Sequence, residues 1–540
     1  MYKKYYWLND ESRTFLNRGY FEETPEQRIK NIAITAEKIL GIKGFADKFE
    51  DYMSRGYYSL ATPVWTNFGK EKALPISCYG SMVDDTLDSI LNAGREIGMM
   101  SKYGGGTSMY LNNIRERGAK ISTGGYADGP VHYTHIYDTI IDKCKQADAR
   151  RGACAVYLDV EHADIMDFLD IGTEGNDIQN LQFGVCVGRK WLTSMKEGDE
   201  VKRKIWAKIL QRRSEFGFPY IFFKDNANEN TPYKELGLII KHTNLCTEIM
   251  LPNDSYNSFV CCVGSINVLH WDEIKHTDAV EVYVQFLNAV MDEFITKAEH
   301  LPGMGRAYRF AKNHRALGMG VLGYHSYLQS KLIPFESLQA KAKNDEIFRI
   351  ISERANLESQ RLYNALGYTC IREGYANTTL MAIAPNKSTG FILDNVSRMI
   401  EPIKSNYFIH DLAKIKSVYK NKMLKQELIK YDLNTPEVWE SILEKDGSCQ
   451  HLDFPTKEVF KSSIEISPME IIIQAAQRQK YIDQGQSLNL MIHPSVPTKD
   501  INALYLKAEE LGIKALYYQF SQNAAQSFAR NINECVNCEG

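Results

Sequence analysis

Residues 243–252 read Thr243-Asn244-Leu245-Cys246-Thr247-Glu248-Ile249-Met250-Leu251-Pro252, which places an amide, a thiol and a carboxylate at alternate positions. In extended backbone, residues i, i+2 and i+4 lie on the same side. Asn244, Cys246 and Glu248 are therefore expected to converge on one ligand. On spacing alone, a partly exposed strand with a buried free cysteine is the favoured interpretation.

Short strand-like runs alternate with long helical stretches along most of the chain. Ten such runs lie around residues 76–82, 107–111, 153–158, 183–187, 220–223, 260–265, 317–322, 379–384, 487–491 and 515–519. This alternation implies crossover connections and mostly parallel strands in one large α/β domain. Ten strands in one twisted sheet favour closure into a barrel. Apolar residues at helical spacing between Pro25 and Ser59 predict a small helical N-terminal region.

The composition is that of an ordinary soluble protein, with 540 residues, 44% of them hydrophobic and 24% charged. A net charge of -3 gives no electrostatic footprint for nucleic acid. No run approaches the roughly 18 consecutive apolar residues of a membrane span, and Met1 to Trp7 lack the apolar core of a secretory signal. We expect a cytoplasmic protein that binds neither nucleic acid nor membranes.

The 11 cysteines are spread too widely for a disulfide framework. Cys535 and Cys538 form a Cys-x-x-Cys motif, which suits thiol–disulfide exchange at an accessible chain end. Taken by itself, the motif is explained at least as well by half of a zinc site or by an incidental pair of cysteines. In the sequence, no second Cys-x-x-Cys or closely spaced His pair would complete such a zinc site. Tyr517 and Tyr518 stand side by side in a strand-like run, where packed sheet residues are the ordinary interpretation.

The stretch around Cys246 resembles the active-site loop of ribonucleotide reductase catalytic subunits, and other motifs follow in that family's order. They are Ala61-Thr62-Pro63 with Asn67, Ser77-Cys78, Lys102-Tyr103-Gly104-Gly105-Gly106, Cys261-Cys262-Val263-Gly264-Ser265-Ile266-Asn267, His314-Arg315-Ala316-Leu317-Gly318-Met319-Gly320-Val321 and Ile482-Asp483-Gln484-Gly485-Gln486-Ser487. This ordered set, over about residues 55–540, is far more specific than any single motif.

The resemblance implies a ten-stranded α/β barrel of two five-stranded parallel halves, antiparallel to each other. Cys246 would stand at the tip of a finger loop inside the barrel. We expect a helical region over residues 1–60, the barrel over 61–526 and a redox-active tail over 527–540.

The same resemblance assigns the chemistry of the finger loop. Cys246 would become a thiyl radical and remove the 3′-hydrogen of a ribonucleotide. Glu248 is suited to accept the 3′-hydroxyl proton as general base, and Asn244 to bond the ribose hydroxyls.

A pair of cysteines would supply the electrons. Cys78 would protonate the departing 2′-hydroxyl, after which Cys78 and Cys261 would become a disulfide. Adjacent residues on a strand face opposite ways, and the family's spacing to Asn267 selects Cys261 rather than Cys262, which would be a packed core thiol.

The tail and the tyrosines acquire roles by the same resemblance. Cys535 and Cys538 would re-reduce the disulfide and be recharged by a thioredoxin- or glutaredoxin-like protein. Tyr517 and Tyr518 match the pair that relays a radical from a separate small subunit in class I members. The metal or radical cofactor then belongs to that subunit, and no cofactor or metal is expected in this chain.

Three other functions compete with this one. An adenosylcobalamin-dependent reductase generates its radical locally and needs no tyrosine pair. A catalytically silent paralogue would not need all five cysteines, Asn244 and Glu248. A zinc-binding interaction protein would use Cys535 and Cys538 as ligands.

The resemblance also places ligand contacts. Substrate would contact Thr62, Ser77, Gly106, Leu245, Pro385, Asn386, Lys387, Ser388 and Thr389. Backbone amides at a helix start suit phosphate, although Lys387 departs from the family pattern and leaves diphosphate or triphosphate open. A deoxynucleoside triphosphate or ATP effector would bind near Asp85, Arg115, Gln146 and Arg151 at a subunit interface, which implies a homodimer. Without the resemblance, Asp85 and Arg115 would be ordinary solvated charges.

The N-terminal region carries one further expectation. Family members that dATP shuts off usually have an extra ATP-binding domain of about ninety residues. Residues 1–56 resemble a helical lead-in instead, so we expect dATP to change which base is reduced without general inhibition.

Overall fold

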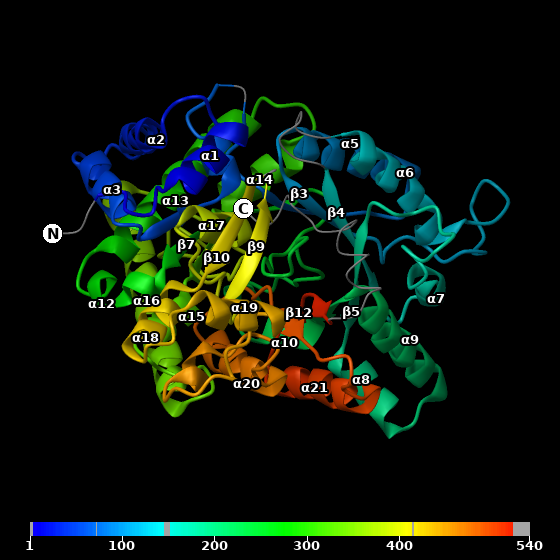
Figure 1. Ribbon diagram of the computed structural model, residues 1–540. Helices are drawn as coiled ribbons and strands as arrows, with labels where there is room; N and C mark the ends of the chain where they lie inside the picture. Colours follow the sequence, from blue (N-terminus) through cyan, green and yellow to red (C-terminus); the bar gives the residue numbers. More distant parts are fainter. Residues whose placement is uncertain (1–3, 72, 145–151, 413–414, 522–540) are drawn as a thin grey trace.

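The computed structural model describes residues 4–71, 73–144, 152–412 and 415–521 (Figure 1). One half of its central sheet contains five parallel strands: β2 (Cys78–Met82), β3 (Gly106–Tyr110), β4 (Ala153–Asp159), β5 (Gln182–Val187) and β6 (Tyr220–Phe223). Every residue of these strands is buried. Burial on both faces explains why these strands are continuous apolar runs rather than alternating patterns.

The second half begins with β7 (Phe259–Asn267), which pairs in parallel with β8 (Leu317–Leu322). Isolated β-bridges add two further segments to this half: one bridge joins Met319 of β8 to Met381, and another joins Ile383 to Gln486. The Tyr517 amide then donates to the Leu488 carbonyl at 3.0 Å. Beside this bond, β11 (Leu490–Met491) pairs in parallel with β13 (Gln519–Phe520).

The two halves meet antiparallel at both seams. β2 pairs with β7, and β12 (Ala515–Leu516) pairs with β6. These pairings confirm the predicted barrel of two five-stranded parallel halves. The segments 379–384 and 487–491, predicted as full strands, join through isolated bridges and the two-residue β11.

Helices surround the barrel (Figure 1). They are α1 (Asp10–Gly19), α2 (Pro25–Leu40), α3 (Phe45–Ser54), α4 (Thr62–Asn67), α5 (Leu87–Lys102), α6 (Gly129–Lys143), α7 (Ile165–Phe168), α8 (Arg189–Glu197), α9 (Glu200–Phe216), α10 (Lys224–Glu229), α11 (Pro232–Glu235), α12 (Trp271–Ile274), α13 (Ala279–Ala298), α14 (Gly305–His314), α15 (Tyr324–Ser330), α16 (Leu338–Leu366), α17 (Lys387–Ile392), α18 (Lys422–Lys430), α19 (Pro436–Glu444), α20 (Pro468–Gln479) and α21 (Thr498–Glu510), with short 3₁₀ turns η1 (Val268–His270) and η2 (Lys457–Phe460). In the described ranges, none of them is long and apolar enough to cross a bilayer.

The predicted helical N-terminal region is present as α1, α2 and α3. α2 illustrates why: the Thr24 hydroxyl accepts from the Gln27 amide, Pro25 occupies the first turn, and Gly41 ends the helix at φ 67°. The predicted domain boundaries at residues 60 and 526 stay predictions, and residues 527–540 lie outside the described part of the chain.

Two features were not predicted. β1 (Tyr58–Leu60) adds to the barrel antiparallel to β7. A hairpin of β9 (Tyr407–Leu412) and β10 (Ile415–Lys420) stands beside α18 and α19, which enclose a second small apolar core around Trp439 and Phe460. These strands are short or lie outside the barrel, so they lack the fully apolar run by which the barrel strands were found.

Candidate active site

The finger loop turns inside the barrel at residues 245–247, where Thr247 has a φ of 69°. The expected extended backbone is therefore wrong at this point. The turn itself brings the ends of the motif together, because the Asn244 Nδ2 donates to the Glu248 Oε1 at 2.9 Å. Asn244, Cys246 and Glu248 are all buried, so the convergence exists but arises from a tight turn.

Hydrogen bonds from distant segments of the chain hold this loop. Tyr157 on β4 donates its hydroxyl to the Asn244 carbonyl at 2.9 Å. The Gly485 amide donates to the Glu248 carbonyl at 2.8 Å. A Cβ on Gly485 would lie 3.2 Å from that carbonyl oxygen and 2.4 Å from the Met250 methyl, so this close approach favours glycine.

Ser487 lies against both the thiol-bearing residue and the carboxylate. Its Oγ is 2.6 Å from the Cys246 carbonyl oxygen and 3.0 Å from the Glu248 Oε2. Burial raises the pKa of the Glu248 carboxyl to about 7, although the bonds from Asn244 and Ser487 oppose the shift. A carboxyl group with this pKa can accept or release a proton near neutrality, as a general base requires.

Cys78 on β2 and Cys261 on β7 are register partners across the first antiparallel seam. Directly opposed residues in such a pair have Cα atoms about 4.5–5.5 Å apart, which is within the range of a disulfide. Neither cysteine is joined in a disulfide. Cys262 instead pairs with Leu317 of β8, so the seam brings Cys78 to Cys261 and not to its neighbour.

The two tyrosines continue outward from the thiol. The Tyr517 hydroxyl donates to the Cys246 Sγ at 3.5 Å. The ring centroids of Tyr517 and Tyr518 are 4.3 Å apart, and the Tyr220 ring lies 4.9 Å and 5.2 Å from them. Arg213 holds the pair in place by donating to the Tyr517 carbonyl at 3.0 Å. The structure therefore gives a continuous aromatic path to Cys246.

The candidate phosphate loop, Pro385 to Thr389, leads into α17. The Asn386 Nδ2 donates to the Thr389 Oγ1 at 3.3 Å, and the Ser265 hydroxyl on β7 donates to the Asn386 Oδ1 at 3.3 Å. Ser265 and Cys261 are four residues apart on one strand and therefore share a face. Ser388 is buried and Lys387 half-buried.

The other predicted substrate residues lie on different elements. Ser77 precedes Cys78, and its carbonyl accepts from the Gly106 amide at 2.7 Å. Leu245 is buried in the finger loop. Thr62 begins α4, where its hydroxyl is 3.1 Å from that of Tyr20.

Two of the predicted effector residues contact each other. Arg115 forms an ion pair with Asp85 at 2.6 Å, and its amide donates to the same carboxylate at 3.1 Å. Gln146 and Arg151 lie outside the described residues. The pairing places Asp85 and Arg115 together but leaves the effector site itself a prediction.

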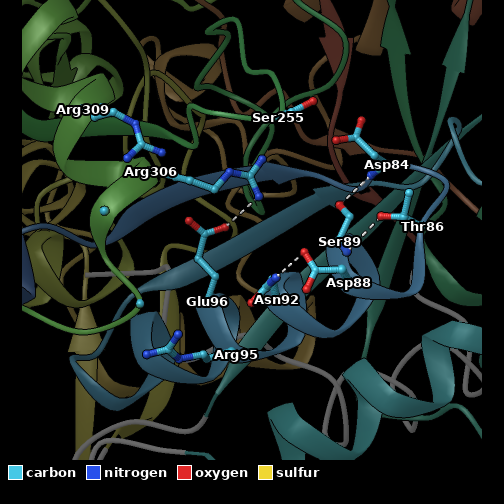
Figure 2. A pocket seen from close by; sticks show the side chains of 12 residues that line it. Asp84, Thr86, Asp88, Ser89, Asn92, Arg95, Glu96, Ser255, Arg306 and Arg309 are labelled. Carbon is cyan, nitrogen blue, oxygen red and sulfur yellow. Dashed lines mark hydrogen bonds and ion pairs between the residues drawn. The ribbon is translucent and has the colours of Figure 1, made fainter.

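A cavity of about 450 Å³ lies on the flank of α5 and is lined by none of the predicted site residues. Figure 2 shows contacts between its polar side chains. Asn92 donates to Asp88 at 2.9 Å, and Arg306 contacts Glu96 at 3.4 Å. Among the described residues, no group of three or more His, Cys, Asp or Glu side chains is arranged to hold a metal ion.

Sequence reasoning missed several residues that contact the site. Gln484 and Ser487 belong to a segment that the resemblance had matched, but no role was assigned to them. Arg213 and Tyr220 carried no local signal, because an arginine in a helix or a tyrosine in a strand is common and the sequence does not show that Arg213 is buried.

Comparisons with known proteins agree with this arrangement. The model of the ribonucleotide reductase barrel domain matches residues 76–202, 193–370 and 359–519, and that of the ribonucleotide reductase all-alpha domain matches residues 2–73. The putative ribonucleoside-diphosphate reductase large subunit of Frog virus 3 (isolate Goorha) is 32% identical over 94% of both chains. The corresponding subunit of Invertebrate iridescent virus 3 is 31% identical over 96% of both. The solved class Id ribonucleotide reductase alpha subunit of Actinobacillus ureae is 51% identical, with a TM-score of 0.92 over 98% of this chain and 100% of that one.

The raised pKa of Glu248 predicts a pH-dependent stability difference. The pKa of its carboxyl rises from the usual 4.5 to about 7 on folding. Between these two pH values the folded state therefore keeps a proton that the unfolded state has lost. Glu248 then lowers the free energy of unfolding as pH rises from about 4.5 through 7, by about 3 kcal/mol in all. Glu248→Gln should remove this loss. Denaturant unfolding of both proteins at pH 5 and pH 8 measures it, and parallel pH dependence would contradict the shift.

Proposed function

The chain belongs to the ribonucleotide reductase large-subunit family, and from this membership we propose that it reduces ribonucleoside diphosphates to 2′-deoxyribonucleotides by thiyl-radical chemistry. The observation that carries the proposal is one buried interior that contains Cys246 in contact with Tyr517, the general base Glu248 and the opposed thiols of Cys78 and Cys261. The diphosphate form of the substrate is taken from the names of the viral relatives.

The reaction starts at the contact between Tyr517 and Cys246. A separate small subunit supplies the oxidising equivalent from its own metal or radical cofactor. Tyr518 and then Tyr517 pass it inward, and the thiol hydrogen of Cys246 moves to the Tyr517 oxygen across 3.5 Å. The Cys246 thiyl radical then removes the 3′-hydrogen of the ribose.

The remaining groups complete the reduction. Glu248 takes the 3′-hydroxyl proton while Asn244, bonded to it, orients the ribose. Cys78 protonates the 2′-hydroxyl, which leaves as water. Cys78 and Cys261 together lose two electrons and two protons and form a disulfide: one proton leaves in the water, and the other, with the two electrons, supplies the new hydrogen of the 2′-carbon. Cys246 then returns the 3′-hydrogen to the 3′-carbon, and Glu248 returns the proton to the 3′-oxygen. The net exchange of one hydroxyl for hydrogen consumes one dithiol.

Binding and recharging complete the cycle. The substrate phosphates lie at residues 385–389, near the start of α17, with Thr62, Ser77, Gly106 and Leu245 around the sugar. Cys535 and Cys538 reduce the Cys78–Cys261 disulfide and are recharged by a thioredoxin- or glutaredoxin-like protein. A deoxynucleoside triphosphate or ATP binds near Asp85 and Arg115 in a cytoplasmic homodimer.

The direct test is a reduction assay with the four ribonucleoside diphosphates, with and without a candidate small subunit. Deoxyribonucleotide formation that requires the small subunit supports the proposal. Activity that instead requires adenosylcobalamin would identify the other class of reductase, and absence of activity under both conditions would favour a silent paralogue.

Cys246→Ser should abolish turnover, because an alcohol does not readily furnish the corresponding oxygen radical, while substrate binding persists. Cys262→Ala is the matched control, since Cys262 is equally buried but pairs with β8 and is expected to keep activity. Product formation and equilibrium nucleotide binding are measured for each variant. Comparable turnover by Cys246→Ser would refute the thiyl assignment.

Tyr517→Phe and Tyr518→Phe should each stop turnover without unfolding the chain, because only the redox-active hydroxyl is lost and the ring still packs. Tyr324→Phe serves as control: its hydroxyl is buried but donates to the Ala340 carbonyl at 2.9 Å, outside the aromatic path. Activity with the small subunit and thermal unfolding are compared. If either variant keeps its activity, that tyrosine does not relay the radical and only packs in the sheet.

A further inference from the structure

The two thiols opposed across the first seam have unequal surroundings. Cys261 is 0% exposed, and the backbone of Gly318 on the neighbouring β8 packs so close to its Sγ that an added Cβ would stand 3.2 Å away. Cys78 is 7% exposed, and its register partner on β3 is Gly106, which has no side chain. An incoming group therefore finds more room at the sulfur of Cys78.

The polar contacts of the two sulfurs differ as well. The Gln484 Nε2 lies 3.5 Å from the Cys261 Sγ as a donor. Its orientation is fixed from both ends, because Nε2 also donates to the Leu317 carbonyl at 2.8 Å and Oε1 accepts from the Met250 amide at 3.0 Å. An amide nitrogen can only donate, so it offsets part of the cost that burial imposes on a thiolate at Cys261. The Cys78 Sγ has the Ser77 hydroxyl at 3.7 Å.

Thiol–disulfide exchange is directional. A thiolate attacks one sulfur of the disulfide, and the other sulfur leaves with the bonding electron pair. When Cys78 and Cys261 are joined, access and charge stabilisation therefore decide which of them is attacked.

We propose that the incoming thiolate attacks the Sγ of Cys78 and that Cys261 leaves as the thiolate beside the Gln484 amide. This inference rests on the proposed function, in which the disulfide forms at each turnover. The new bond joins the incoming sulfur to Cys78, and the bond between Cys78 and Cys261 breaks. A second thiolate then attacks the incoming sulfur and releases Cys78, so one dithiol is oxidised and one disulfide reduced.

Protonation of the released Cys261 keeps the first step from reversing. Burial raises the pKa of the Cys261 thiol well above its usual value, although the Gln484 contact opposes the shift. The released thiolate therefore takes up a proton. Because only the thiolate is a nucleophile, the protonated Cys261 no longer attacks the mixed disulfide on Cys78.

The attacked sulfur can be identified by trapping the mixed disulfide. Cys535→Ser and Cys538→Ser each leave one tail thiol, which can attack but cannot complete the exchange. Each reduced variant is given ribonucleoside diphosphate and the small subunit, quenched in acid, alkylated and mapped by peptide mass spectrometry. Cys262, a buried thiol next to Cys261, should be recovered as free thiol and checks that no scrambling occurred.

The expected product links the remaining tail cysteine to Cys78 and leaves Cys261 alkylated, with at least a tenfold excess over the opposite linkage. Equal amounts, or an excess linked to Cys261, would overturn the inference and leave the proposed function intact. The Cys535→Ser/Cys538→Ser variant separates the two claims: absence of a Cys78–Cys261 disulfide after its turnover would refute the proposed function and the inference together.

Gln484→Met tests the role of the amide as a positioning residue. It removes the donor beside Cys261 and should move the linkage ratio toward parity. A purely structural role would lower the yield of both mixed disulfides without moving the ratio. An unchanged ratio would therefore show that Gln484 does not influence which sulfur is attacked.

Discussion

Antiparallel pairing at the two seams of the barrel is the constraint on which the rest of the structure depends. The seam between β2 and β7 sets Cys78 opposite Cys261, and the seam between β6 and β12 leads the chain into Tyr517. Side chains on neighbouring strands are fixed relative to one another by the register, and a slip of one residue would turn them to the other face. The opposed thiols of Cys78 and Cys261 and the tyrosines beside Cys246 therefore reach the same interior because the sheet closes.

The finger loop satisfies a second constraint, since a polar loop inside a barrel must find partners for its buried groups. Tyr157 on β4 and the segment that contains Gly485 and Ser487 supply them from two distant parts of the chain. The same burial that requires these bonds raises the pKa of Glu248 to about 7. Structure and chemistry thus share one cause, because the enclosure that excludes water also makes the carboxylate a base near neutrality.

The barrel strands could be predicted from the sequence because both faces of each strand are buried, which leaves apolar runs such as Ala153–Asp159. The hairpin of β9 and β10 gave no such signal. The convergence of Asn244 and Glu248 was expected for a wrong reason, since the backbone turns at Thr247 instead of extending. Contacts such as Ser487 on Cys246, 241 residues apart, follow from tertiary packing and have no local pattern. The choice of Cys261 over Cys262 came from a family resemblance, and the register supplies its geometric basis.

In the proposed function, Cys78 and Cys261 hold the electrons for one reduction. The most direct measurement uses Cys535→Ser/Cys538→Ser, pre-reduced and freed of small thiols, with the small subunit and a protein reductant. About one deoxyribonucleotide should form per active site, with loss of the Cys78 and Cys261 thiols in equal amount. Undiminished multiple turnover with both thiols still free would contradict it.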